Sequence, residues 1–147
     1  MSNIQAVTIL LVEDDPGHAR LIEKNLRRSN INNHILTIND GQRAIDYLFN
    51  EGEYANSQPD SPLLVLLDLN IPGVDGYQVL KRMKEDPRTK RIPVVILTTT
   101  DDSREVAKCY NLGCNVYVTK PVDYEQFSEA ICKIGLFLSV VTVPNGV

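Results

Sequence analysis

The sequence has no tryptophan, only three cysteines, and no apolar run long enough to cross a membrane. A membrane-spanning helix needs about 20 mostly apolar residues, and the stretch from Met1 to Val7 has none of the features of a signal peptide. The cysteines form no CxxC pair, so neither a zinc site nor a disulfide framework is expected from Cys109, Cys114 and Cys132. We therefore expect reduced thiols in a cytoplasmic protein.

Basic residues are outnumbered by acidic ones, with 15 Lys and Arg against 19 Asp and Glu and a formal net charge of −4. No basic stripe is present, so neither nucleic acid nor a membrane surface is an expected partner. What is present suits one globular domain, because 147 residues at 43% hydrophobic content can bury an ordinary core. The sequence shows no repeats, no low-complexity segment and no interdomain linker.

Continuous apolar runs alternate with segments of helical periodicity. Runs such as Leu63 to Leu67 are typical of strands covered on both faces, as in the middle of a parallel sheet. The alternation predicts an α/β fold with a flavodoxin-like, doubly wound (βα)5 arrangement and a five-stranded parallel sheet of order 2-1-3-4-5. The expected strands are residues 7–12, 34–38, 63–67, 92–97 and 116–119, and residues 51–61 are expected to form a long loop.

Helix signals fill the segments between the strands. Asp15 followed by Pro16 is a strong helix start, and Asp101 or Asp102 is expected to cap the fourth helix. The fourth helix should place three residues on one face and end at Gly113; these are Val106, Ala107 and Tyr110. The last helix should open at Asp123 and bury Phe127, Ile131 and Ile134.

Polar side chains stand where four of the strands end. Glu13 and Asp14 follow the first strand, Asp68 the third, Thr98 ends the fourth, and Lys120 follows the fifth. The carboxyl ends of parallel strands meet at one edge of a sheet, so these side chains can share one pocket. Three neighbouring carboxylates are costly without a cation, and an all-oxygen ligand set suits Mg²⁺.

This set of groups is suited to holding a phosphoryl group, with Asp68 as candidate nucleophile for an acyl phosphate. Each group alone has an ordinary explanation. Acids such as Glu13 and Asp14 are favoured near a helix N-terminus, Asp68 could cap the next helix, Thr98 could be strand-end polarity and Lys120 a surface lysine. Their coincidence at four strand ends is what favours a site.

The pattern Glu13-Asp14, Asp68, Thr98 and Lys120-Pro121 resembles the receiver domain of two-component response regulators, as does the stretch LDLNIPGVDG at residues 67–76. The resemblance spans nearly the whole chain. It implies a response regulatory domain at residues 7–137, followed by an apolar tail at residues 138–147.

The resemblance also implies a role for each matching residue. Asp68 would accept a phosphoryl group from a sensor histidine kinase, and Lys120-Pro121 would be a cis peptide. Mg²⁺ would be bound by Glu13, Asp14, Asp68 and the backbone carbonyl of Asn70. Thr98 and Lys120 would contact the phosphoryl group, and Thr98 and Tyr117 would form the switch. The protein would then be a signalling receiver and not an enzyme, apart from its own phosphotransfer and autodephosphorylation.

A narrower resemblance rests on loops and the tail. Gly52-Glu53-Tyr54, Arg91 to Val94 and Val141 to Pro144 are similar to stand-alone regulators that partner bacterial, especially cyanobacterial, phytochrome kinases. Thr99 departs from the family pattern, where a smaller residue is usual, and this affects access to the phosphate. The apolar end at residues 135–143 predicts a homodimer, because a receiver core is complete before it.

Three alternatives differ in specific residues. A haloacid-dehalogenase-like, Mg-dependent phosphatase needs a second acid two positions after its nucleophile, where this chain has Asn70. A flavodoxin-like redox carrier needs a hydroxyl- and glycine-rich loop after the first strand, where this chain has Glu13-Asp14-Asp15. A binding module without phosphoryl chemistry would need neither the acidic cluster nor Lys120.

Overall fold

The computed structural model describes residues 8–29, 31–55, 64–120 and 123–130. The strands within these ranges are β1 (Ile9–Val12), β2 (Ile35–Ile38), β3 (Leu64–Leu67), β4 (Val94–Thr98) and β5 (Val116–Thr119). The helices between them are α1 (Pro16–Arg28), α2 (Gly41–Phe49), α3 (Gly76–Glu85) and α4 (Ser103–Leu112), with a short 3-10 turn η1 (Gly52–Tyr54) after α2. Residues 124–130 are also helical.

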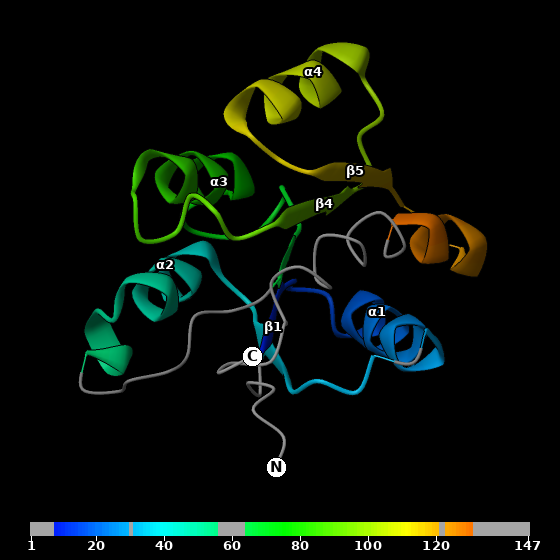
Figure 1. Cartoon of the computed structure of the whole chain (residues 1–147), viewed down its shortest axis with the longest axis horizontal. Helices are drawn as coiled ribbons and strands as arrows, with labels where there is room; N and C mark the ends of the chain where they lie inside the picture. Colours follow the sequence, from blue (N-terminus) through cyan, green and yellow to red (C-terminus); the bar gives the residue numbers. More distant parts are fainter. Residues whose placement is uncertain (1–7, 30, 56–63, 121–122, 131–147) are drawn as a thin grey trace, which may run out of the picture.

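All strand pairs are parallel and the order is β2-β1-β3-β4-β5, which confirms the predicted sheet. Helix α1 and segment 124–130 cover one face of the sheet, and α2, α3 and α4 cover the other (Figure 1). Every residue of β1, β3 and β4 is buried, as expected for strands between two helical layers. In the edge strand β5, buried and half-buried residues alternate.

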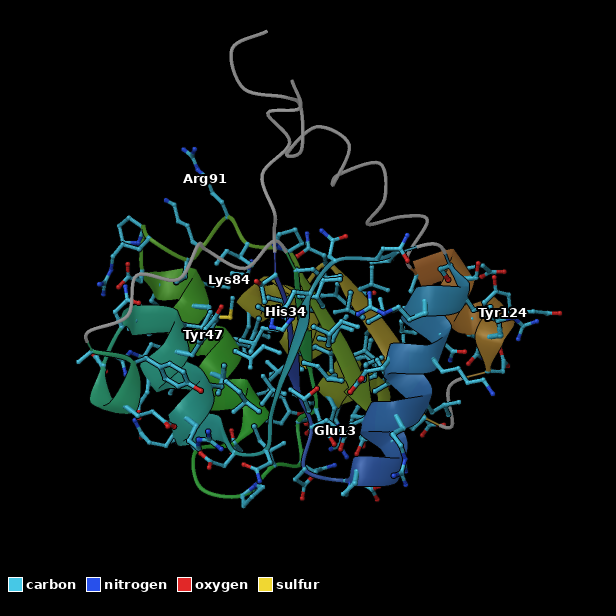
Figure 2. The ribbon with its side chains drawn as sticks, turned by 90° about the horizontal axis from the view of Figure 1, so that it is seen from below. Glu13, His34, Tyr47, Lys84, Arg91 and Tyr124 are labelled. Atoms are coloured by element: carbon cyan, nitrogen blue, oxygen red, sulfur yellow. The ribbon has the colours of Figure 1, made fainter. Side chains whose placement is uncertain are left out.

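The register of the sheet brings the strand ends together. Val12 pairs with Leu67, Leu67 with Ile96, and Thr98 with Thr119. The residues that follow β1, β3 and β5 therefore leave the sheet at one edge. Figure 2 shows Glu13 at this edge, where β1 ends and α1 begins, with Arg91 at the opposite end of the molecule.

The four labelled α-helices each begin at an aspartate that accepts hydrogen bonds from backbone N–H groups of the first turn. Asp15 caps α1 with Pro16 in the first turn, as predicted, and Asp102 is the residue that caps α4. Asp123 likewise accepts from the N–H of Gln126 at 2.7 Å. Because α1 to α4 each follow the end of a parallel strand, their N-termini lie at the edge of the sheet where the strands end.

Helix α4 differs from its predicted packing. Its buried residue is Cys109, while Ala107 is exposed and the side of the helix carrying Tyr110 faces out, with Tyr110 47% exposed. The reason lies in the outermost strand, β5. The backbone N–H of Tyr117 in the edge strand donates to the hydroxyl of Tyr110 at 3.2 Å, which holds that ring outside the core.

The remaining expectations concern individual helices and segments, and some of them fall outside the described residues. Helix α3 begins at Gly76, because Asp75 is its N-cap and forms a capping box with Gln78. Phe127 is buried as predicted. The expected loop at 56–61, Pro121, Ile131, Ile134 and the tail at 138–147 lie outside the described residues. Within the described part of the chain, no helix is both long and apolar enough to span a membrane.

Candidate functional site

Three carboxylates meet at the edge where the strands end. Glu13 is 2% exposed and Asp68 is 6% exposed, while Asp14 faces solvent. One oxygen from each side chain lies within 4.8 Å of the others. The predicted acidic cluster is therefore assembled, and its oxygen ligands at this spacing suit a hard divalent cation.

Lys120 lies against this cluster from the end of β5. Its ammonium group donates to Glu13 Oε1 and to Asp68 Oδ2 at 3.1 Å, and its Nζ lies 3.0 Å from His18 Nδ1. Its side chain is only 6% exposed, and its backbone N–H donates to the carbonyl of Thr98 at 2.6 Å. The predicted lysine thus contacts two of the three acids directly.

Opposing effects set the pKa values of this pair. Burial alone would lower the pKa of Lys120, but hydrogen bonds to Glu13 and Asp68 outweigh it and hold that pKa above its usual value. Burial raises the pKa of Glu13, although the hydrogen bond from Lys120 acts in the opposite direction. One ammonium cannot balance three carboxylates, so the edge retains excess negative charge.

Asn70 links Asp68 to the end of β4. Its backbone N–H donates to Asp68 Oδ1 at 3.0 Å, and its side-chain Nδ2 donates to Thr98 Oγ1 at 3.2 Å. Thr98 is fully buried and Asn70 is exposed. The structure therefore brings Thr98 next to the acidic site through the Asn70 amide. A backbone carbonyl of Asn70 as metal ligand stays a prediction.

The turn after Asp68 depends on two glycines. Gly73 has a φ of +76°, a conformation that favours glycine. Gly76 begins α3, and its N–H donates to the carbonyl of Leu69 at 3.1 Å. A Cβ at Gly76 would lie 2.5 Å from the carbonyl oxygen of Asp68, so only glycine lets the start of α3 approach the site this closely.

Tyr117 occupies β5 two strand positions before Thr119. Its hydroxyl donates to the carbonyl of Thr100 at 2.6 Å, and the ring is half-buried. Burial, followed by nearby Cys109 and Glu105, raises the pKa of Tyr117 to about 12. This contact ties the predicted switch residue to the segment that follows β4. Thr99, which departs from the family pattern, is exposed beside this segment.

His18 and the Asn70 side chain are site features that the sequence did not reveal. His18 lies in the first turn of α1, five positions after Glu13, so its placement next to the strand ends follows once Asp15 and Pro16 are seen to start the helix. Its contact with Lys120 spans 102 positions in the sequence. No local pattern predicts a contact over that separation.

A groove of about 260 Å³ lies between β5 and segment 124–130. Its lining consists of Val116, Tyr117, Val118, Thr119, Gln126, Glu129 and Ala130. None of the three clustered acids lines it. The chemistry of the strand-end site needs room only for an ion and a small anion, so a large cavity is not required there.

The site can hold a divalent cation and a small oxyanion together. The carboxylates supply metal ligands, Lys120 supplies a fixed positive charge, and the amide of Asn70 and hydroxyl of Thr98 supply hydrogen-bonding groups. This combination is typical of phosphoryl chemistry.

Comparisons with known proteins agree with this geometry. The family model of the response regulator receiver domain matches residues 9–132. The response regulator Rcp1 of Synechocystis sp. is 41% identical over 137 residues, which is 92% of this chain and 92% of Rcp1.

Two solved structures are similar to this chain in fold as well as in sequence. The phosphorylated cyanobacterial phytochrome response regulator RcpA has a TM-score of 0.78 at 38% identity, covering 97% of this chain and 100% of RcpA. The Mn²⁺-bound form of Rcp1 has a TM-score of 0.78 at 39% identity, covering 94% of this chain and 99% of that one. The haloacid-dehalogenase-like alternative finds no support in these relatives.

Proposed function

Because this chain belongs to the response regulator receiver family, we propose that Asp68 accepts a phosphoryl group from a sensor histidine kinase. The supporting observation is the position of Lys120, which lies 3.1 Å from Asp68 Oδ2 inside the acidic cluster. A carboxylate oxygen of Asp68 would attack the phosphorus of a phosphohistidine. The new bond joins that oxygen to phosphorus, and the P–N bond breaks with its electron pair returning to the imidazole.

The metal in this proposal is Mg²⁺, held by Glu13, Asp14, Asp68 and the carbonyl of Asn70. Receiver domains bind a divalent metal, and the relative Rcp1 has a Mn²⁺-bound form. When bound, the cation offsets the charge of the carboxylates and attracts phosphoryl oxygens. The oxygen ligands gathered within 4.8 Å support this assignment.

The remaining residues would bind the transferred group. Lys120 would pair with one phosphoryl oxygen, using protons that contact Glu13 and Asp68 in the resting state. Thr98 would turn its hydroxyl from Asn70 to a second oxygen. This movement would vacate space near β4 that the ring of Tyr117 could enter, so that a local charge biases a two-state element. A structure with beryllofluoride bound in which Thr98 and Tyr117 have not moved would contradict the switch.

The proposed kinase is of the bacterial phytochrome type, and the proposed location is the cytoplasm. The support is the likeness to RcpA and Rcp1 over nearly their full lengths. Transfer rates from a panel of purified kinases would test it. Preference for kinases of another class would contradict the phytochrome assignment.

The phosphoacceptor is tested with a small-molecule phosphodonor. Incubation with acetyl phosphate and Mg²⁺ should add the mass of one phosphoryl group to the wild type and none to Asp68→Asn. Asp40→Asn is a matched control, because Asp40 accepts from the N–H of Arg43 at 2.7 Å as the cap of α2, a role that asparagine also fills. Full labelling of Asp68→Asn would contradict the proposal.

We also propose that the domain at residues 7–137 forms a symmetric dimer through α4, β5 and segment 124–130, together with the tail at 138–147. Exposed Tyr110, the groove beside β5 and the position of β5 at the edge of the sheet support this face. Light scattering should give a dimer for the full chain and a smaller species for a chain ending at Phe137. Two monomers would contradict it.

A further inference from the structure

The contact between His18 and Lys120 has no role in the function proposed so far. His18 Nδ1 lies 3.0 Å from Lys120 Nζ, and the imidazole also lies 4.0 Å from Glu13 Oε2. The His18 side chain is 47% exposed, whereas that of Lys120 is 6% exposed. The imidazole therefore stands between the lysine ammonium and the solvent at the mouth of the site.

This contact completes the bonding of the ammonium group. A lysine ammonium has three N–H donors and no acceptor. In the structure these donors have three partners, which are Glu13 Oε1, Asp68 Oδ2 and His18 Nδ1. Two partners are carboxylates on the inner side, and the imidazole is the partner on the outer side. For Lys120 to donate, Nδ1 must be the ring nitrogen without a proton.

The imidazole is not needed to start the helix on which it lies. The backbone N–H of His18 donates to the cap residue Asp15 at 3.1 Å, whereas the ring Nδ1 lies 3.9 Å from Asp15 Oδ2, beyond hydrogen-bond distance. Pro16 and the second cap bond from Gly17 to Asp15 at 2.8 Å are also independent of the ring. A change of side chain at position 18 can therefore alter the bond to Lys120 while leaving the start of α1 in place.

We propose that His18 is a positioning residue that holds the Lys120 ammonium where an incoming phosphoryl oxygen will be placed. Without the imidazole, the ammonium would have only Glu13 and Asp68 as protein partners. It would then shift toward Glu13, whose oxygen is the nearer of the two, and water would occupy its outer side. With it, the ammonium stays within reach of Asp68. Preorganised charge of this kind requires no rearrangement at the moment of transfer.

The inference rests on the proposed role of Lys120 in phosphoryl transfer, so its test needs one measurement that does not depend on phosphorylation. Three variants at position 18 separate the possible contributions of the ring. His18→Asn keeps an acceptor, Oδ1, at the position of Nδ1. His18→Leu keeps a branched side chain of similar shape near the backbone but has no acceptor, and His18→Ala removes both. His34→Ala is the control, because His34 is the other histidine of the chain and precedes β2.

The first measurement follows the ammonium itself. In the resting protein, proton exchange of the Lys120 ammonium with water is observed by NMR of a ¹⁵N-lysine-labelled sample. Exchange should be severalfold faster in His18→Leu and His18→Ala than in wild type, His18→Asn and His34→Ala. Equal exchange in all five proteins would overturn the positioning role, whether or not the chain is phosphorylated.

The second measurement is the rate of phosphorylation by acetyl phosphate with Mg²⁺ across a range of donor concentrations. The maximal rate constant should fall about fivefold in His18→Leu and His18→Ala, with little change in half-saturation, and should recover in His18→Asn. Wild-type rates in His18→Leu would overturn the inference while the proposed function stands. A wild-type protein that takes no phosphoryl group, with ammonium exchange as predicted, would instead overturn the proposed function and leave the resting contact of His18 with Lys120 in place.

Discussion

Replacing Asp68 by asparagine should stabilise the metal-free protein, although Asp68 is buried. The site holds one oxygen from each of Glu13, Asp14 and Asp68 within 4.8 Å of the others, and among the described residues Lys120 is the one ammonium in contact with them. Asparagine keeps the shape of the side chain and an oxygen that can accept from the N–H of Asn70. The substitution therefore removes charge and little else.

The magnitude follows from the distances. At an effective dielectric constant of about 20, unit charges 4.8 Å apart repel by about 3.5 kcal/mol, and opposite charges 3.1 Å apart attract by about 5 kcal/mol. The attraction of Asp68 to Lys120 thus exceeds its repulsion from Glu13 by about 2 kcal/mol. Burial of a carboxylate costs several kcal/mol, and Asp14 adds repulsion that water partly screens. We expect Asp68→Asn to raise the free energy of unfolding by about 1–2 kcal/mol.

Urea unfolding with a metal chelator present measures this difference directly. With Mg²⁺ at 100 times its dissociation constant, the wild type should gain about 2.7 kcal/mol, and Asp68→Asn should gain less than about 1 kcal/mol. Asp40→Asn removes a charge from a helix cap outside the cluster, so it should respond to Mg²⁺ as the wild type does. The reasoning is refuted if Asp68→Asn is less stable than wild type in chelator, or gains as much from Mg²⁺.

Two further predictions concern the packing around Gly76 and the burial of Cys109 and Cys114. Gly76→Ala places a Cβ 2.5 Å from a backbone carbonyl oxygen and should lower the free energy of unfolding in urea by about 1–3 kcal/mol. Gly17→Ala should cost less, because its Cβ would meet only the Asp15 side chain, at 3.2 Å, and equal effects would contradict the close approach at Gly76. Burial raises the pKa of Cys109 to about 11 and that of Cys114 to about 12, so both thiols stay protonated at pH 8. In a Cys132→Ser chain, a thiol reagent at pH 8 should react slowly until urea unfolds the protein, and rapid reaction of the folded chain would contradict this burial.

The strands and the location of the site could be predicted because both depend on short-range patterns. The apolar residues of β1, β3 and β4 are continuous in the sequence, and such runs are buried between two layers of helices. Parallel pairing then brings Asp68 and Lys120 to one edge without further information. Their separation of 52 positions did not matter, because each side chain follows a strand.

Contacts that depend on the direction of side chains could not be predicted. The outward position of Tyr110 follows from its bond to the N–H of Tyr117 in the edge strand, which helical periodicity does not include. The contact of His18 with Lys120 requires the register of α1 against β5, and the bond from Asn70 to Thr98 requires one rotamer of an exposed amide. These are properties of packing, and a single sequence carries no local signal for them.

The chemical identity of the phosphorylated residue tests the central claim most directly. Borohydride reduces an aspartyl phosphate by two successive hydride transfers to the acyl carbon: the first releases phosphate and leaves an aldehyde, and the second, with a proton from water, gives homoserine in place of the aspartate. After treatment with acetyl phosphate and Mg²⁺, reduction and peptide sequencing by mass spectrometry should place homoserine at position 68 and at no other acidic residue. Homoserine at position 14 or 15, or a phosphate that survives on a histidine, serine or threonine, would contradict Asp68 as the phosphoacceptor.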